Sequence, residues 1–344
     1  MLALQKTLPG HGLQLEDVAP PAIEDPTDVL VRVRSVGVCG TDLHIDEWTP
    51  SYHFMAPSLP VTLGHEFSGE VAATGTDVRN LSIGQLVVVR PSVVCGVCAA
   101  CKAGRADDCV TRRGIGVTRE GAFATHVRVP ARNCLAVPAG VDADVAALAE
   151  PLSVSLEAVR TGEVGPGQRV LVLGPGNIGQ GIALFAREAG AAQVVVAGHD
   201  DAPRLEVLAR MGFDALLDFS RGDMTELLAP WLQDGRFDVV IEATGASRVI
   251  APALAALRPR GILVITGIHA QPVPIDLTAL VRRHLQIRAS YRAPESAWPE
   301  VIAFMARHQA VLRHMVTHRV ALTEAQDAFA LARNKQATKV MVQP

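Results

Sequence analysis

The sequence predicts an α/β protein with two domains, one rich in β-strands and one built as a doubly wound parallel sheet. Its 344 residues are enough for two hydrophobic cores. Short strands separated by long loops are expected up to Pro151, and strands that alternate with helices are expected after it. Hydrophobic residues make up 49% and charged residues 19%, which is typical of a globular chain.

The first part of the chain carries strand patterns. Residues 28–37 alternate apolar and polar side chains with period two, which predicts a half-buried strand. Residues 61–90 and 121–137 indicate further short strands broken by Gly and Pro. These patterns favour a β-rich domain with long loops.

The second part alternates helix and strand patterns. The expected elements are a helix over 153–162, a strand over 169–173, a helix over 178–188, a strand over 191–198, a helix over 203–211, a strand over 237–244, a helix over 249–259 and a strand over 261–268. The strands are nearly all apolar, as expected when helices cover both faces of a parallel sheet.

Near the C-terminus, Thr323 and Gln326 have the spacing of a capping box, which predicts that a helix begins there. Residues 337–343 predict a last strand. Periodicity alone does not decide whether this strand extends the parallel sheet or returns to the first domain.

Charge and hydropathy exclude several classes of partner. The formal net charge is −3 and there is no long basic run, which argues against nucleic acid or an anionic membrane. The first residues lack the pattern of a signal peptide, and no apolar run approaches the ~20 residues of a membrane helix. We therefore expect a cytoplasmic protein.

The stretch "VVCGVCAACKAGRADDC" contains four of the six cysteines, namely Cys95, Cys98, Cys101 and Cys109. A disulfide cluster, a nucleic-acid-binding zinc module and a structural metal site are the alternatives. Cytoplasmic thiols stay reduced, which favours metal. Nucleic-acid zinc modules usually separate two ligand pairs by about 12–20 residues, whereas these four crowd into one lobe. Four thiolates complete a tetrahedral zinc site, so the lobe is predicted to be structural.

Three glycines suggest a nucleotide site. Gly174, Gly176 and Gly179 form G-x-G-x-x-G between a predicted strand and a predicted helix, the context that dinucleotide binding requires. Such glycines let the backbone approach a pyrophosphate, and the helix N-terminus attracts its charge. A turn needed only for packing is the alternative.

The end of the second strand, where an acid usually binds the adenosine ribose, carries Gly198. NAD fits if Asp200 or Asp201 reaches the ribose, and NADP fits if His199 and Arg204 receive a 2′-phosphate. Because the two carboxylates would repel that phosphate, NAD is favoured, and Gly198→Asp is expected to tighten NAD. The predicted cofactor-contacting residues are Gly174, Gly176, Asn177, Ile178, Gly179, Gly198, His199, Arg204, Thr244 and Gly267.

A second group of metal-ligating residue types is spread over three short motifs. These are "VGVCGTDLHIDEW" with Cys39, Thr41 and His44, "LGHEFSGEV" with His65 and Glu66, and "LAEPLSVS" with Glu150. Thiolate, imidazole and carboxylate are good zinc ligands. Taken singly, each has a plainer interpretation as a core or surface residue.

Together these motifs resemble those of the zinc-dependent medium-chain alcohol dehydrogenases, across essentially the whole chain. The matching pieces are G-x-C-G-T-D-x-H at 37–44, G-H-E-x-x-G at 64–69, the cysteine lobe at 95–109, E-P-L at 150–152 and the glycine fingerprint at 174–179. The resemblance implies a GroES-like catalytic domain over residues 1–151 and 293–344. It implies a Rossmann dinucleotide-binding domain over residues 152–292, with the C-terminal segment returning to the first domain.

The resemblance also implies roles for single residues. Cys39, His65 and Glu66 would hold a catalytic zinc, with Glu150 as a ligand or near-ligand. The lobe cysteines would hold a structural zinc, which gives two zinc ions per chain. Thr41 and His44 match the family's proton-relay positions. A small-molecule alcohol, NAD or NADP, and a homotetramer or homodimer are expected.

Within the family, the closest resemblance is to L-threonine 3-dehydrogenases, through "ALQKTLPGHGLQLEDV", "CGTDLHIDEW", "YRAPESAW" and "VTHRVALTEAQDAF". It implies oxidation of L-threonine to 2-amino-3-oxobutanoate, with Arg292 as a candidate to bind the substrate carboxylate. Sorbitol and 2,3-butanediol dehydrogenases share the Cys-His-Glu set and are the alternative. The segment "TPSYHFMAPSLP" at 49–60 does not follow the threonine enzymes closely.

Overall fold

The structure, a computed structural model, describes all residues from Met1 to Pro344. The chain divides into two compact units, residues 1–150 with 302–344, and residues 151–301. The family resemblance implies a second boundary at residue 293, whereas the second compact unit of the structure ends at residue 301.

The first unit is built on antiparallel strands. Its strands are β1 Leu2–Lys6, β2 Gln14–Asp17, β3 Asp28–Gly37, β4 Val61–Thr62, β5 Glu66–Thr74, β6 Leu86–Val89, β7 Ser92–Val93, β8 Arg113–Gly114, β9 His126–Pro130, β10 Cys134–Ala136, β17 Val316–Ala321 and β18 Lys339–Gln343. The main sheet has the order β10-β6-β5-β3-β18-β17, with β9 also paired to β3, and β2-β1-β4 form a smaller sheet. The predicted β-rich character of the first domain is confirmed.

Strand β3 shows why the period-two pattern holds. Val29, Val31 and Val33 are buried in the core of the unit, whereas Arg32 and Arg34 on the opposite face are exposed. Because alternate side chains of a strand point to opposite faces, this arrangement buries one face of β3 and leaves the other in contact with solvent.

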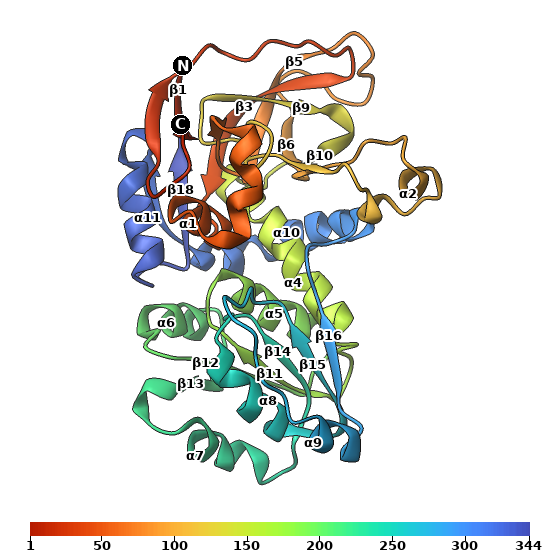
Figure 1. Cartoon of the computed structure of the whole chain (residues 1–344), viewed down its shortest axis with the longest axis vertical. Helices are drawn as coiled ribbons and strands as arrows, with labels where there is room; N and C mark the ends of the chain where they lie inside the picture. Colours follow the sequence, from red (N-terminus) through yellow and green to blue (C-terminus); the bar gives the residue numbers. More distant parts are fainter. The chain divides into compact units, whose positions relative to one another are not determined.

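The C-terminal strand lies inside this first sheet. Strand β18 pairs antiparallel with β3, with Met341 opposite Gly37 and Val342 opposite Val36, and it pairs parallel with β17. Figure 1 shows β18 in blue among the red and orange N-terminal strands. This pairing brings residues that are about three hundred positions apart into one sheet.

The chain contains eleven α-helices. They are α1 Gly40–Asp46, α2 Ala99–Lys102, α3 Ala143–Ala147, α4 Ala149–Thr161, α5 Asn177–Glu188, α6 Ala202–Arg210, α7 Met224–Leu228, α8 Ile250–Ala256, α9 Leu277–Arg282, α10 Trp298–Leu312 and α11 Ala325–Arg333. The capping box predicted from Thr323 and Gln326 is wrong. A 3-10 turn over Leu322–Glu324 precedes α11, and Glu324 accepts a hydrogen bond from the backbone N–H of Ala321.

The second unit contains six parallel strands. They are β11 Arg169–Leu173, β12 Gln193–Gly198, β13 Leu216–Asp218, β14 Phe237–Glu242, β15 Leu257–Ile265 and β16 Gln286–Ala289, in the order β13-β12-β11-β14-β15-β16. Counted from β11, this is the order 3-2-1-4-5-6 of the dinucleotide-binding doubly wound fold. The predicted Rossmann fold is therefore confirmed.

No helix has both the length and the apolar composition that crossing a bilayer would require.

Candidate functional site

Three of the predicted catalytic ligands come together in the first unit. Cys39 is the N-cap of α1, which follows β3, and His65 and Glu66 lie where β5 begins. Their Sγ, ring-nitrogen and carboxylate-oxygen atoms all lie within 4.8 Å of one another. His65 and Glu66 are buried. One thiolate, one imidazole and one carboxylate fit zinc, and such a set leaves a fourth position for a further ligand.

Asp42 contacts two of the three residues, Cys39 and His65. Its buried carboxylate accepts a hydrogen bond from the backbone N–H of Cys39 at 2.9 Å and lies 3.6 Å from Nδ1 of His65. Burial raises the pKa of Asp42 to about 6, against the opposing effect of His65. A carboxylate facing one ring nitrogen of a ligating histidine leaves the other nitrogen for the metal. The sequence analysis assigns no role to Asp42, although it lies within the G-x-C-G-T-D-x-H motif.

Lys339 on β18 is a second residue that the sequence analysis misses. Its buried ammonium group donates to the Glu66 carboxylate and, at 2.9 Å, to the carbonyl oxygen of Val38. Burial is the largest single influence and opposes the charge, but Glu66, with help from Cys39, keeps the pKa of Lys339 above its ordinary value. A lysine directly before the apolar run Val340, Met341 and Val342 is the signal that could have revealed it.

Glu150 lies near the cluster without belonging to the close group. It is in the first turn of α4, and it is absent from the three residues whose ligand atoms lie within 4.8 Å of one another. Burial raises the pKa of its carboxyl to about 7; His65 opposes this rise and Glu66 adds to it. Direct ligation by Glu150 stays a prediction.

The two predicted relay residues share one face of α1. Thr41 and His44 are three residues apart, a spacing that makes side chains neighbours on a helix. The Tyr52 hydroxyl, which the sequence analysis does not single out, donates a hydrogen bond to Oγ1 of Thr41 at 3.0 Å.

The cysteine lobe has the geometry of a metal site. Sγ of Cys95 lies 3.9 Å from Sγ of Cys101 and 3.6 Å from Sγ of Cys109, and all four thiols form one group within 4.8 Å. A Zn–S distance of about 2.3 Å at tetrahedral angles places sulfurs about 3.8 Å apart. Disulfide sulfurs would lie about 2 Å apart, and all six cysteines are free. Cys134, the remaining cysteine outside both groups, is buried in the core.

The glycine loop is shaped for an anion. A Cβ on Gly179 would lie 1.7 Å from the carbonyl oxygen of Gly174, whereas one on Gly176 would meet nothing within 4 Å. Helix α5 begins after Gly176 without a side-chain cap, and Oδ1 of Asn177 is buried with no hydrogen-bond partner. Open space above uncapped helix N–H groups suits a pyrophosphate. Ile178 occupies the first turn of the same helix.

The end of β12 corrects one expectation. A Cβ on Gly198 would lie 2.8 Å from Cγ of Pro175 and 2.9 Å from Cβ of Asp201, so Gly198→Asp does not fit. Asp201 is buried, and its carboxylate accepts hydrogen bonds from the backbone of His199 and from Arg204, each at 3.2 Å.

These contacts narrow the candidates for ribose recognition. The carboxylate of Asp201 and the guanidinium of Arg204 bond to each other in the second unit. Asp200 and the His199 side chain are exposed at the strand end. The exposed carboxylate of Asp200 is thus the better candidate to meet a ribose hydroxyl.

Thr244 and Gly267 lie at the C-terminal ends of β14 and β15. The buried Glu242 carboxylate accepts hydrogen bonds from the backbone N–H and hydroxyl of Thr244 and from the backbone N–H of Gly245. A Cβ on Gly267 would lie 2.7 Å from Oε2 of Glu242, and one on Gly174 would lie 2.9 Å from Cγ2 of Thr244. The structure therefore brings Gly174, Thr244 and Gly267, three of the predicted cofactor-contacting residues, close together.

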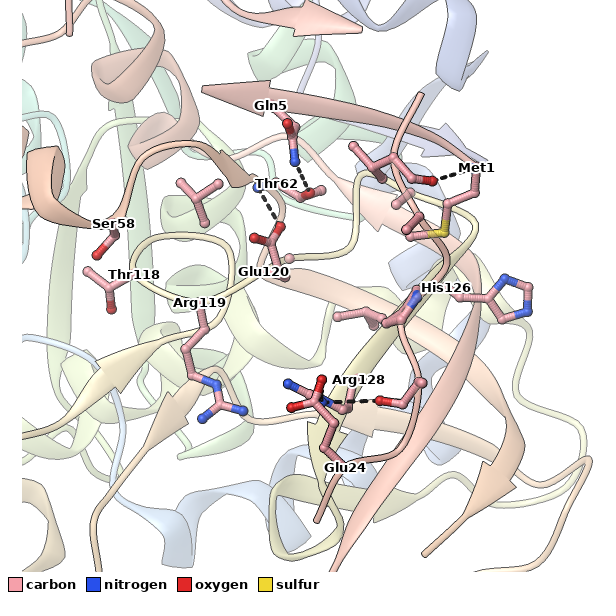
Figure 2. A pocket seen from close by; sticks show the side chains of 18 of the residues that line it. Met1, Gln5, Glu24, Ser58, Thr62, Thr118, Arg119, Glu120, His126 and Arg128 are labelled. Atoms are coloured by element: carbon pink, nitrogen blue, oxygen red, sulfur yellow. Dashed lines mark hydrogen bonds and ion pairs between the residues drawn. The ribbon is translucent and has the colours of Figure 1, made fainter. Parts of the chain in front are cut away.

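A separate pocket of about 450 Å³ in the first unit is not part of either cluster. Figure 2 shows it, with Arg128 paired to Glu24 and with Thr62 bonded to Glu120 and Gln5. None of the predicted zinc ligands, relay residues or glycine-loop residues lines it. The two groups of candidate metal ligands lie outside this pocket.

Comparisons with known proteins agree with this architecture. Residues 25–139 match the alcohol dehydrogenase GroES-like domain, and residues 177–307 match the zinc-binding dehydrogenase family. An L-threonine 3-dehydrogenase from Rhizobium johnstonii is 32% identical over 99% of this chain and 98% of its own length.

Two solved structures are also similar over the whole chain. A protein from Sinorhizobium meliloti 1021 described as a zinc-binding dehydrogenase, bound to NADP, has a TM-score of 0.89 and 31% identity, covering 100% of this chain and 99% of that one. The 2R,3R-butanediol dehydrogenase from Bacillus subtilis has a TM-score of 0.88 and 26% identity, with the same coverage.

The fold, the two groups of candidate metal ligands and these matches together define the class of protein. The chain belongs to the zinc-binding, medium-chain alcohol dehydrogenase family. It is an NAD(P)-dependent oxidoreductase that acts on the alcohol group of a small molecule.

Proposed function

We propose that this enzyme oxidises L-threonine at its secondary hydroxyl to 2-amino-3-oxobutanoate. The observation that carries the proposal is the 32% identity to an L-threonine 3-dehydrogenase along 99% of the chain. A dehydrogenase for 2,3-butanediol or another polyol is the second candidate, favoured by the similarity to the Bacillus subtilis enzyme.

We assign the catalytic zinc to Cys39, His65 and Glu66, with Glu150 beside them, and a second zinc to the four lobe cysteines. When bound, the metal would act as a Lewis acid on the substrate oxygen and the nicotinamide would accept the hydride. Thr41 would take the proton of the substrate hydroxyl, and His44 would carry it towards solvent. Lys339 and Asp42 would hold two of the ligands in place.

We assign the cofactor to the loop from Gly174 to Gly179 and to the strand end at Asp200, with NAD favoured over NADP. The exposed Asp200 carboxylate supports NAD, since it would bond ribose hydroxyls and repel a 2′-phosphate. The structure of a 31% identical protein bound to NADP is the observation that favours NADP instead. Both cofactors therefore belong in the test.

The substrate determines what else the site must bind. L-Threonine carries a carboxylate, for which a bidentate arginine is a suitable partner, whereas a diol needs only neutral partners. Arg292 has a left-handed backbone, with φ of 64°, and its Nε is buried without a hydrogen-bond partner. Such a guanidinium suits the carboxylate of L-threonine.

The decisive experiment is a substrate panel with NAD and NADP, followed as absorbance at 340 nm. L-Threonine is expected to give the highest kcat/KM, and Arg292→Leu is expected to raise KM for L-threonine far more than for butane-2,3-diol. Brisk turnover of diols or sorbitol without any rate on L-threonine would transfer the assignment to the polyol class.

A further inference from the structure

One tyrosine contacts both predicted relay residues. Its hydroxyl donates to Oγ1 of Thr41 at 3.0 Å, and the ring of Tyr52 stacks on the imidazole of His44, with centroids 6.0 Å apart and planes inclined by 15°. Tyr52 belongs to residues 49–60, the segment in which this sequence departs from the L-threonine enzymes.

The backbone around Tyr52 is anchored. Its segment forms a 3-10 helix over Pro50–Ser58, in which Met55 is fully buried in the core. The N–H of Tyr52 donates to the carbonyl oxygen of Thr49 at 2.9 Å, and the rings of Trp48 and His53 stack with centroids 5.4 Å apart. The phenol is therefore presented to Thr41 from a fixed position.

This contact restricts the Thr41 hydroxyl. A threonine hydroxyl has one hydrogen to donate and two lone pairs to accept. When the Tyr52 phenol occupies one lone pair, the hydrogen and the other lone pair of Thr41 remain for the substrate side and the outgoing side. A group held in its reacting orientation before the step avoids the entropic cost of finding it.

We propose that Tyr52 is a positioning residue for proton removal, which holds the Thr41 hydroxyl and the His44 imidazole in the geometry that the transfer needs. The inference rests on the proposed function. The Thr41 oxygen gains the proton of the substrate hydroxyl as its own proton leaves towards His44 and solvent. Tyr52 keeps its own proton throughout.

The test is a double-mutant cycle on the intact enzyme with saturating NAD and the preferred alcohol. Tyr52→Phe keeps the ring and removes the hydroxyl, and we expect kcat to fall about tenfold, at or below the lower end for a general acid–base step. The kcat of Thr41→Val should fall further than that of Tyr52→Phe. The double variant should match Thr41→Val within about twofold, because a residue that acts through another has no effect once that one is gone.

Two further readouts separate positioning from damage to the fold. The solvent deuterium isotope effect on kcat should rise in Tyr52→Phe, since proton transfer then limits turnover more. The Kd for NAD, measured by calorimetry, and the melting temperature should both stay at the wild-type values. A fall in melting temperature that parallels the loss of kcat would assign Tyr52 a merely structural role and overturn the inference.

Thr49→Val is the matched control. It removes a hydroxyl from the same segment, one that is buried without a hydrogen-bond partner, and wild-type kcat is expected. Wild-type kcat in Tyr52→Phe together with a slow Thr41→Val would overturn the inference and leave the relay standing. A loss of kcat in the double variant that equals the product of the two single losses would also overturn the inference, because the two residues would then act independently. Wild-type kcat in Thr41→Val would show that Thr41 does not take part in proton transfer, which would contradict the proposed relay and, with it, the inference.

Discussion

At residue 198 the fold leaves no room for the carboxylate that commonly recognises a ribose at this place. Pro175 and Asp201 occupy the volume that a Cβ would need. We propose that ribose recognition moves along the chain to the exposed carboxylate of Asp200, whose backbone N–H donates to Asp218 at 3.0 Å. The missing acid in the sequence is therefore a steric consequence of how the glycine loop packs on β12.

Asp200→Ala is expected to raise KM for NAD about tenfold or more, because a hydrogen bond to a charged group contributes about 1.5–3 kcal/mol. KM for NADP should stay constant or fall, since a carboxylate that repels the 2′-phosphate is lost. Steady-state kinetics with both cofactors measure this, with exposed Asp214→Ala in the same unit as control. A wild-type enzyme that strongly prefers NADP would contradict the assignment.

Asp42→Asn is expected to lower the affinity of the catalytic site for zinc about 10–100-fold, the usual effect of losing a carboxylate that orients a ligating histidine. Competition with a chelating dye measures the affinity. Asp46→Asn on the same helix, whose carboxylate pairs with Arg333, is the control and should bind zinc as the wild type does. Equal zinc affinity in both variants would remove the role given to Asp42.

Among the elements, the cysteine lobe is the one that we expect to depend most on a metal. It contains only the short helix α2 and one 3-10 turn, and Val97 and Val110 are 70% and 82% exposed. With so little apolar burial of its own, the lobe needs thiolate ligation to hold its shape.

Cys101→Ser is therefore expected to lower the melting temperature, while Cys39→Ser should abolish most activity and leave the melting temperature close to that of the wild type. Differential scanning calorimetry and the 340 nm assay give the two values for each variant. Two variants that lose stability and activity to the same extent would show that the division into structural and catalytic zinc is wrong.

Element prediction from the sequence succeeds where periodicity is strong. The pattern at 28–37 coincides with β3, and the glycine turn leads into α5 as expected. Strands β13 and β16 are too short, at three and four residues, for a period to be visible. The sequence analysis does not predict α10, although buried Trp298, Val301 and Met305 follow helical spacing.

For the whole molecule, two separate donor groups predict two zinc ions per chain. Elemental analysis of protein purified without chelator is expected to find both, and prolonged dialysis against a strong chelator should remove activity. Restoring activity requires Zn²⁺ at the Cys39 group, so Cys39→Ser should regain metal at the lobe without regaining turnover. A single zinc in active enzyme would contradict the prediction.

The site as a whole could be predicted only in part. Ligands carried by short motifs, such as His65 with Glu66, can be recognised within a few residues of sequence. The pairing of Glu66 with Lys339 joins positions 273 residues apart and exists only because β18 docks beside β3. No local pattern contains that information, because strand pairing across the sheet decides it.

The placement of β18 also sets an order of events during synthesis. Residues 151–301 leave the ribosome as one continuous block, so the second unit can fold while the first still lacks its C-terminal strands. Until β18 emerges, Val36 and Gly37 at the end of β3 lack their β18 partners, although β9 pairs with residues 28–32 of the same strand, and the carboxylate of Glu66 has no ammonium partner. The group of Cys39, His65 and Glu66 thus gains its lysine contact only at the end of synthesis, after the whole second unit has been made.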